Sequence, residues 1–271
     1  MIPAAFQYSR ASSVDEAVQL LGRQGPDAKV LAGGHSLIPL MRLRLAKPGA
    51  LVDINPLERE LSYVRRDNGR LHIGALTRHY QIESSDEVKR SLPLLAEVAA
   101  EVGDLQVRSM GTIGGVLAHA DPAGDYGTLA LMLDAEITTT RRTIPARDFF
   151  VGVFTTPLEA DELITEVAFP VATGPHAYLK FRRRLFDWAI IAVGAQRVDG
   201  EVRVGVTNAA PTPVRATAVE QALNQGAAPT EAAKQVVQNI DPAADLRGSV
   251  EYKRHLAQVL TERALNAVSS S

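Results

Sequence analysis

Two glycine-rich segments constrain this chain more than any other feature. The first, Ala32-Gly33-Gly34-His35-Ser36, follows a short apolar stretch at 29–31 that is expected to form a strand. Glycine tolerates positive φ and leaves the backbone bare, so consecutive N–H groups can converge on an anion. Residues 37–45 are expected to form a helix whose N-terminus points at the same anion. The segment therefore predicts a turn that can bind a phosphate group.

The second segment, Gly111-Thr112-Ile113-Gly114-Gly115, favours a ligand-binding site over two unrelated tight turns. A single Gly-Gly pair is more often only a tight turn, and neither segment matches the Rossmann or P-loop pattern. Here a second bare loop adds the Thr112 hydroxyl, and Asp121 and Asp125 follow it. One diphosphate held between two loops, with a carboxylate for a ribose hydroxyl, describes a dinucleotide site.

The absence of cysteine limits the redox chemistry of the chain. None of the 271 residues is a cysteine, which excludes thiolate-bound iron–sulfur clusters, disulfides and thiol chemistry. The electrons of a redox function must therefore sit on an organic cofactor. The six histidines are scattered without ligand spacing, so no metal site is predicted.

Charge and hydropathy exclude other partners. The formal net charge is -2, and no basic run is longer than Arg182-Arg183-Arg184, so no nucleic-acid surface is predicted. No stretch approaches the roughly 20 apolar residues of a membrane helix. The N-terminus has no signal-peptide pattern, so a cytoplasmic location is expected.

The order of the predicted secondary-structure elements changes near residue 172. Before it, helices alternate with short strands, including a helix capped by Ser13 and a hairpin turn at Asp67-Asn68-Gly69. Beyond a linker at 171–175, strands come first and helices follow, which indicates a separate α+β domain. The elements expected in this domain are strands 177–181, 189–197 and 202–207, helices 216–223, 230–238 and 250–267, and a frayed tail at 269–271.

A family resemblance rests on these segments. AGGHSLIPLMRLRLAKPGALVDIN and GTIGGVLAHADPAGD closely resemble the flavin-binding medium subunit of the molybdenum hydroxylases, the family of aerobic carbon monoxide dehydrogenase and xanthine dehydrogenase. The resemblance covers essentially the whole chain, including DELITEV and YLKFRRRLFDWAIIAVG. It implies an α+β fold, with a two-subdomain FAD-binding fold of the vanillyl-alcohol oxidase (PCMH) type in 1–172, divided near 56. Residues 173–271 would form a carbon monoxide dehydrogenase flavoprotein C-terminal domain with an antiparallel sheet and helices.

The resemblance also implies a role for individual residues in binding FAD noncovalently, with no catalytic residue on this chain. Asp125 would bind the adenosine ribose, and Leu163 and Lys180 would lie beside the isoalloxazine ring, where a positive charge favours the reduced, anionic flavin. The residues implied around the pyrophosphate are Ala32, Gly33, Gly34, His35, Ser36 and Leu37 on one side and Gly111, Thr112, Ile113, Gly114 and Gly115 on the other.

The implied function is electron transfer inside a larger complex. Substrate would be hydroxylated at a molybdopterin centre on a large subunit, and electrons would pass through iron–sulfur clusters on a small subunit to this FAD. An external acceptor such as NAD, oxygen or a quinone would take them. The alternatives are a self-contained flavin oxidase or reductase with its own small substrate, and a binding module whose flavin site has decayed.

Several residues keep two interpretations. His35 could bind FAD covalently, although the family holds FAD noncovalently and varies at this position. Trp188 could shield the flavin or belong to the core, and Arg182-Arg183-Arg184 could line a partner surface or a solvated strand face. His119 and Asp121 are expected near the flavin without a catalytic role. Val116 replaces the Asn that the family commonly has after the second Gly-Gly pair.

Overall fold

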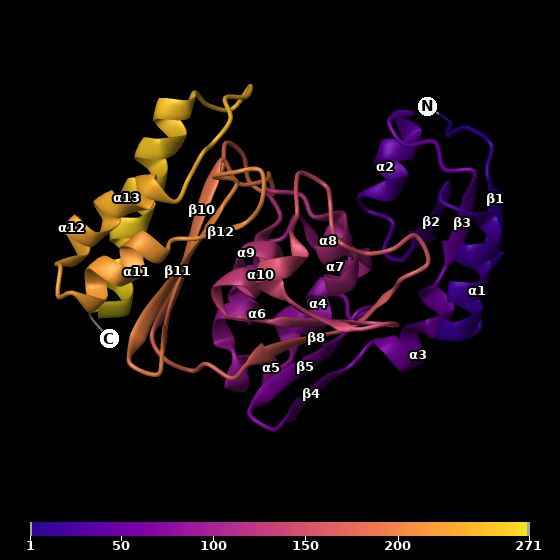
Figure 1. Ribbon diagram of the computed structural model, residues 1–271, viewed down its shortest axis with the longest axis horizontal. Coiled ribbons are helices and arrows are strands. Elements are labelled where there is room, and N and C mark those ends of the chain that lie inside the picture. The colour runs from indigo at the N-terminus through magenta and orange to yellow at the C-terminus, as the bar shows by residue number, and fades with distance from the viewer. Residues whose placement is uncertain (1, 270–271) are drawn as a thin grey trace.

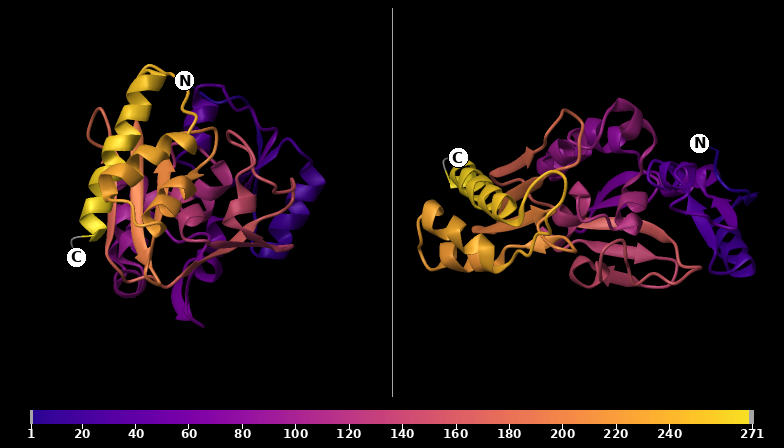
Figure 2. Two further views of the ribbon diagram at one scale, coloured as in Figure 1. Left: turned by 60° about the vertical axis from the view of Figure 1, so that its left-hand side comes forward. Right: turned by 90° about the horizontal axis from the view of Figure 1, so that it is seen from above.

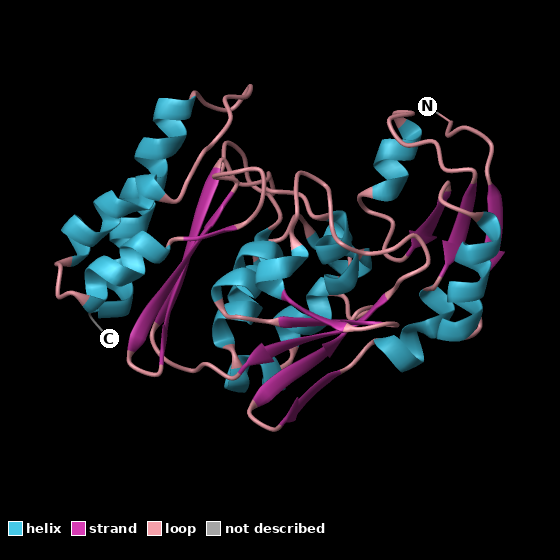
Figure 3. Ribbon diagram, viewed as in Figure 1, coloured by secondary structure: helices cyan, strands magenta, loops and turns pink. Residues whose placement is uncertain are grey.

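The computed structural model describes residues 2–269. The chain forms three parts in a row, each with its own sheet and hydrophobic core (Figures 1 and 2). The N-terminal part lies at one end, the C-terminal part at the other, and a helix-covered sheet occupies the middle (Figure 3).

The N-terminal part is a parallel sheet in the order β1-β3-β2, formed by Gln7–Arg10, Ala50–Asp53 and Ala28–Leu31. Helix α1 (Val14–Gln24) buries Ala17 and Leu21 in its core, and the Ser13 hydroxyl caps it, as expected. The carboxyl ends of parallel strands meet at one edge of a sheet, which is where such sheets bind ligands. Here β2 leads into the first glycine-rich segment and helix α2 (Leu37–Arg42), while β3 leads to Asn55.

The middle part is an antiparallel sheet with helices on one face (Figure 1). Its hairpin turns at Asn68 and Gly69, which both have positive φ, as the sequence predicts. The central strand β8 was not predicted. The strands, in spatial order, are β4 (Val64–Asp67), β5 (Arg70–Gly74), β8 (Ile164–Pro170), β6 (Glu136–Thr139) and β7 (Thr143–Pro145).

The helices of the middle part are shorter and more numerous than the sequence indicates. Ser85 divides the helical stretch 79–91 into two helices, and two further helices lie on either side of Gly111, where the sequence predicts a loop. The helical segments are η1 (Asn55–Leu57), α3 (Glu58–Leu61), α4 (His79–Ser84), α5 (Asp86–Ser91), α6 (Pro93–Ala100), α7 (Leu105–Met110), α8 (Ile113–His119), α9 (Asp125–Met132) and α10 (Ala146–Phe149).

The C-terminal part is an antiparallel sheet covered by helices, which confirms the predicted α+β fold. Its strands, in spatial order, are β12 (Val214–Arg215), β11 (Glu201–Thr207), β10 (Ile191–Val198) and β9 (His176–Phe181). Its helices are α11 (Thr217–Asn224), α12 (Pro229–Lys234), η2 (Gln235–Gln238) and α13 (Val250–Ser269).

The proposed division of the chain near residues 56 and 172 stays a prediction. Leu61, Leu76 and Leu163 pack in the N-terminal core although they follow residue 56. Ser269 ends α13 rather than starting a frayed tail, and 270–271 lie outside the described residues. Within 2–269, none of the helices combines the length and apolar character that a membrane crossing requires.

Candidate functional site

The first glycine-rich segment presents an unbroken row of free amides. The segment joins β2 to α2, and Gly34 has a φ of 71°. Five consecutive N–H groups donate no hydrogen bond to any described residue, those of Gly33, Gly34, His35, Ser36 and Leu37. The His35 side chain is exposed, so the residue contributes its backbone to this row. Such converging amides are suited to an anion.

The second glycine-rich segment is the beginning of a helix instead of a bare loop. Thr112 is the N-cap of α8, and its hydroxyl accepts from Gly115 N at 3.2 Å. Ile113 N donates to Thr77 O, and Gly114 N donates to Ala75 O. Because these amides are already bonded, this segment offers fewer free donors than the first one, although Thr112 N donates to no described residue.

The two segments touch each other, which the sequence could not reveal. A Cβ on Gly33 would stand 2.2 Å from Met110 O and 2.9 Å from Gly111 Cα. A Cβ on Gly111 would in turn stand 2.5 Å from His79 Nε2. Side chains cannot fit at either position, so the glycines allow the two backbones to pack into one site.

Asn55 and Arg78 form a hydrogen-bonded bridge between the two glycine-rich segments. Asn55 Nδ2 donates to Ala32 O at 2.8 Å, and Asn55 Oδ1 accepts from Arg78 NH2 at 2.8 Å. Arg78 NH1 then donates to Met110 O, immediately before Gly111. This bridge was not predicted, because no local sequence pattern marks Asn55 or Arg78 as residues of the site.

Asp53 anchors the bridge at the end of β3. Its carboxylate accepts from Asn55 N at 2.9 Å, from Asn55 Nδ2 at 2.7 Å and from the Tyr8 hydroxyl at 2.5 Å. Burial would raise the pKa of Asp53, but these hydrogen bonds outweigh it and hold the pKa below its ordinary value. Asp53 is therefore ionised at neutral pH and fixes the orientation of the Asn55 amide.

His79 lies under the second segment as a neutral ring. Burial, reinforced by the positive charges of His35, Arg108 and Arg78, lowers the pKa of His79 to about 3. The ring is 1% exposed and stacks at 5.2 Å from Tyr126. It supports the Gly111 backbone without carrying charge.

Asp125 and Lys180 form a buried ion pair at the boundary between the middle and C-terminal parts. Lys180 Nζ donates to Asp125 Oδ2 at 2.8 Å and to Glu101 O at 2.9 Å, and the Tyr178 hydroxyl donates to Asp125 Oδ1 at 2.6 Å. Burial raises the pKa of the Asp125 carboxyl, and Lys180 and Tyr178 oppose the rise. Because the pair is neutral overall, the charge that the resemblance places beside the flavin is compensated here.

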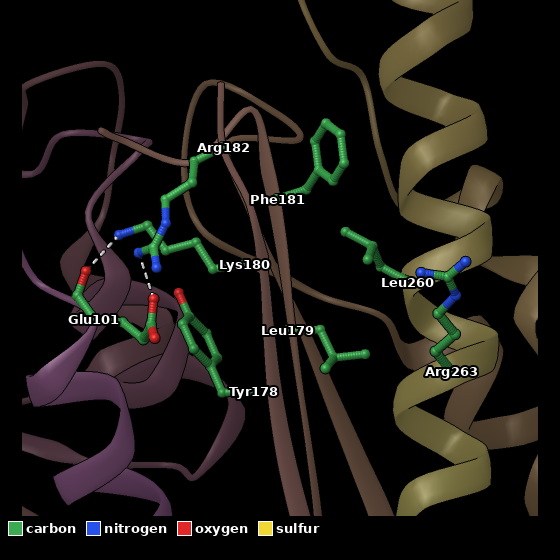
Figure 4. A pocket seen from close by; sticks show the side chains of 8 residues that line it. All are labelled: Glu101, Tyr178, Leu179, Lys180, Phe181, Arg182, Leu260 and Arg263. Atoms are coloured by element: carbon green, nitrogen blue, oxygen red, sulfur yellow. Dashed lines mark hydrogen bonds and ion pairs between the residues drawn. The ribbon is translucent and has the colours of Figure 1, made fainter. Parts of the chain in front are cut away.

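Figure 4 shows the surface pocket next to this pair, which has a volume of about 290 Å³. Lys180 of β9 and Arg182, which follows the end of this strand, point toward Glu101, and Arg182 forms an ion pair with the Glu101 carboxylate. Leu179 and Leu260 lie on the side of α13. Arg182 thus belongs to a contact between two parts of the chain rather than to a solvated face.

The remaining candidate residues are dispersed. Leu163 is 3% exposed and belongs to the N-terminal core. Trp188 is 56% exposed, so it is not a core residue, and the Arg247 guanidinium lies 5.9 Å from its ring centroid. The His119 ring stacks on Phe154, and Val116 packs against the middle core.

The residues at the joined segments fit the diphosphate of a dinucleotide. The free amides supply hydrogen-bond donors, and the glycines keep the backbone accessible. Arg78 supplies a buried positive charge. Backbone donors and a cation are what an anionic diphosphate requires.

Comparison with known proteins gives the same result. Residues 4–172 match the FAD binding domain in molybdopterin dehydrogenase, and residues 176–268 match the CO dehydrogenase flavoprotein C-terminal domain. The chain is 41% identical to the carbon monoxide dehydrogenase medium chain of Hydrogenophaga pseudoflava, with 98% of each covered. It is 39% identical to the glyceraldehyde dehydrogenase medium chain of Sulfolobus acidocaldarius, covering 99% of this chain and 100% of the relative.

Solved structures agree over the full length. Carbon monoxide dehydrogenase from Hydrogenophaga pseudoflava, in a form that lacks the Mo-pyranopterin moiety, aligns with a TM-score of 0.93 at 42% identity, covering 100% of this chain and 99% of the other. Quinoline 2-oxidoreductase from Pseudomonas putida 86 aligns with a TM-score of 0.92 at 29% identity, with the same coverage. The chain therefore belongs to the FAD-binding medium subunits of the molybdenum hydroxylase family, which confirms the resemblance seen in its sequence.

Proposed function

We propose that this subunit receives electrons from the iron–sulfur clusters of a small partner subunit, holds them on FAD and releases them to an external acceptor. The observation that carries the proposal is the packing of the two glycine-rich segments against each other. The first segment has free amides, and the buried cation Arg78 is linked to both segments. Bound FAD would supply the redox chemistry, while the protein supplies binding, orientation and electrostatics. NAD, oxygen and a quinone are the acceptor classes that an electron-transfer flavin serves.

The proposed site has three regions. The first segment, from Ala32 through Leu37, would bind the pyrophosphate with its amides, and the second, from Gly111 through Gly115, would close its other side. Asp125 would bind the adenosine ribose, since each of its oxygens can accept a further hydrogen bond beside those from Tyr178 and Lys180. Leu163 and Lys180 would border the flavin ring. No catalytic residue is assigned to this chain.

The substrate chemistry is proposed to lie on a large molybdopterin subunit. Relatives that match nearly the whole chain are named for carbon monoxide, glyceraldehyde and caffeine dehydrogenases. Since one fold accompanies such different substrates, the chain itself does not select among them. A sequence without cysteine also requires that the clusters lie on another subunit. The cytoplasmic location expected from the sequence belongs to this proposal.

The test uses the full chain with and without its partner. The chain is reconstituted with excess FAD, freed of unbound flavin and denatured, and the visible spectrum of the released flavin is recorded. We expect one FAD per chain, reduction of this flavin by a reduced iron–sulfur small subunit, and no turnover of small organic substrates by the chain alone. Absence of releasable FAD, or substrate turnover by the isolated chain, would contradict the proposal.

A further inference from the structure

Arg78 is a buried cation that no carboxylate neutralises. It is 6% exposed, and its two hydrogen-bond acceptors, Met110 O and Asn55 Oδ1, are both neutral. Three other deeply buried cationic side chains of the described chain all have acidic partners: Arg108 pairs with Glu83 at 2.9 Å, Lys180 with Asp125 at 2.8 Å, and Lys253 with Asp245 at 2.8 Å. Arg78 forms no ion pair with any described residue.

Two independent contacts place the Arg78 guanidinium close to the start of the first glycine-rich segment. One is Asn55, which bonds Arg78 through its carbonyl oxygen and Ala32 O through its amide nitrogen. The other is Met110 O, which accepts from Arg78 and would stand 2.2 Å from a Cβ on Gly33. The guanidinium is therefore separated from Ala32 and Gly33, where the row of free amides begins, by only one hydrogen-bonded residue on each side.

An isolated charge inside a protein is costly because burial removes its hydration, and a nearby opposite charge offsets that cost. An anion bound at these amides would accept hydrogen bonds from the backbone and would be attracted by the positive charge of Arg78 at low local dielectric. A diphosphate brings two negative charges to this position. The unbalanced cation and the unbonded amides are therefore complementary to one ligand group.

We propose that Arg78 is the counter-charge for the diphosphate of FAD, and that its bridge to Asn55 and Met110 sets the spacing of the two glycine-rich segments. This inference rests on the proposed FAD site. Arg78 is a positioning residue, since it acts through the Ala32–Gly33 and Met110–Gly111 backbone and through its field, without contacting the flavin ring.

The experiment compares Arg78→Gln and Arg78→Lys with a matched control, Arg108→Gln, in which a cation of equal burial already has a carboxylate partner. FAD affinity of the FAD-free full-length chain is measured by flavin fluorescence at several salt concentrations. ADP and adenosine serve as competitors with and without a diphosphate. The melting temperature of each FAD-free variant reports on the fold.

For Arg78→Gln we expect FAD and ADP affinity to fall about 30-fold or more, the range for removing one partner of a buried charge pair. Adenosine affinity should change little, and FAD affinity should depend less on salt. Arg78→Lys keeps the charge, so its affinity should stay within about tenfold of the unaltered chain with an unchanged salt dependence. Arg108→Gln should lower the melting temperature without changing the preference for ADP over adenosine.

Equal losses for adenosine and ADP, or an unchanged salt dependence in Arg78→Gln, would make Arg78 a structural brace and overturn the inference. If Arg78→Gln does not fold, Arg78→Lys decides, because a loss above about 30-fold in a folded, charge-retaining variant contradicts a counter-charge role. Failure of the unaltered chain to bind FAD would instead overturn the proposed function.

Discussion

The glycines of the site are required for different physical reasons. Gly34 adopts a φ of 71°, a conformation that other residues rarely tolerate. Gly33 and Gly114 are held by their neighbours, since a Cβ would stand 2.2 Å from Met110 O in one case and 2.7 Å from Ala75 Cβ in the other. The sequence alone suggests that glycine clears space for a ligand, whereas at these two positions glycine clears space for neighbouring residues of the protein itself.

Gly33→Ala should therefore separate the two glycine-rich segments. The added methyl group cannot occupy its ideal position, and overpacking of this kind typically costs about 1–3 kcal/mol. We expect a lower melting temperature and at least about tenfold weaker FAD binding, equal to about 1.4 kcal/mol. Gly49→Ala, in the same part of the chain, is the control, because its Cβ would meet only Asp27 Cβ at 3.7 Å. Identical behaviour of the two variants in thermal melts and flavin titrations would refute the packing role of Gly33.

At the scale of elements, local signals were predictable and long-range pairings were not. Ser13 caps α1 and Asp199-Gly200 closes the β10–β11 hairpin, because each depends on neighbours in sequence. The start of α8 was not predicted because two glycines lower helix propensity, whereas hydrogen bonds from Ile113 N and Gly114 N to the carbonyl oxygens of Thr77 and Ala75 fix it in place. The Arg78 bridge spans 23 residues to Asn55 and 32 to Met110, so no local pattern could announce it.

Helix α9 and strand β9 meet through one buried charge pair. Asp125 is the first residue of α9, where a negative charge also complements the helix dipole. Tyr178 and Lys180 are two residues apart in β9, so both side chains lie on one face of the strand, and both bind the Asp125 carboxylate. The ion pair therefore ties the middle part to the C-terminal part at a position where a flavin role is also proposed.

Lys180→Met should destabilise the chain more than the double variant Lys180→Met with Asp125→Asn. The single change leaves a buried carboxylate without its cation, which costs about 3–5 kcal/mol, and the second change removes that charge. Chemical unfolding of the FAD-free variants measures the two free energies. If the double variant regains stability but not FAD affinity, the pair has a flavin role beyond packing. Equal stability of the single and double variants would contradict the ion-pair interpretation.

At the scale of the whole molecule, polar contacts join separately packed cores. Thr207 Oγ1 donates to Thr128 Oγ1 at 2.8 Å between the C-terminal sheet and α9. At the far end of β9, His176 Nε2 lies 3.1 Å from the Glu97 carboxylate of α6. The hydrogen bond with Glu97 is the largest cause of the raised pKa of His176, and burial only partly opposes it. This contact is therefore strongest when His176 is protonated.

Stability should accordingly depend on pH through His176. A folded-state pKa above the ordinary value of 6.5 means that the contribution is complete below that value and is lost as pH rises through the folded pKa. The melting temperature of the unaltered chain should exceed that of His176→Gln at about pH 6, and the two should converge by about pH 9. Glu97→Gln should abolish the same difference. A gap that grows with increasing pH would contradict this assignment.

Because the site combines residues that are distant in sequence, its parts are completed in a fixed order during synthesis of the chain. Gly33 and Asn55 leave the ribosome early, yet the first segment acquires its final neighbours only when Met110 and Gly111 have followed. Asp125 finds its cation only after Lys180 has been made. A nascent chain thus carries one half of the proposed FAD site until the second segment has been made, so the site is complete only after Gly115.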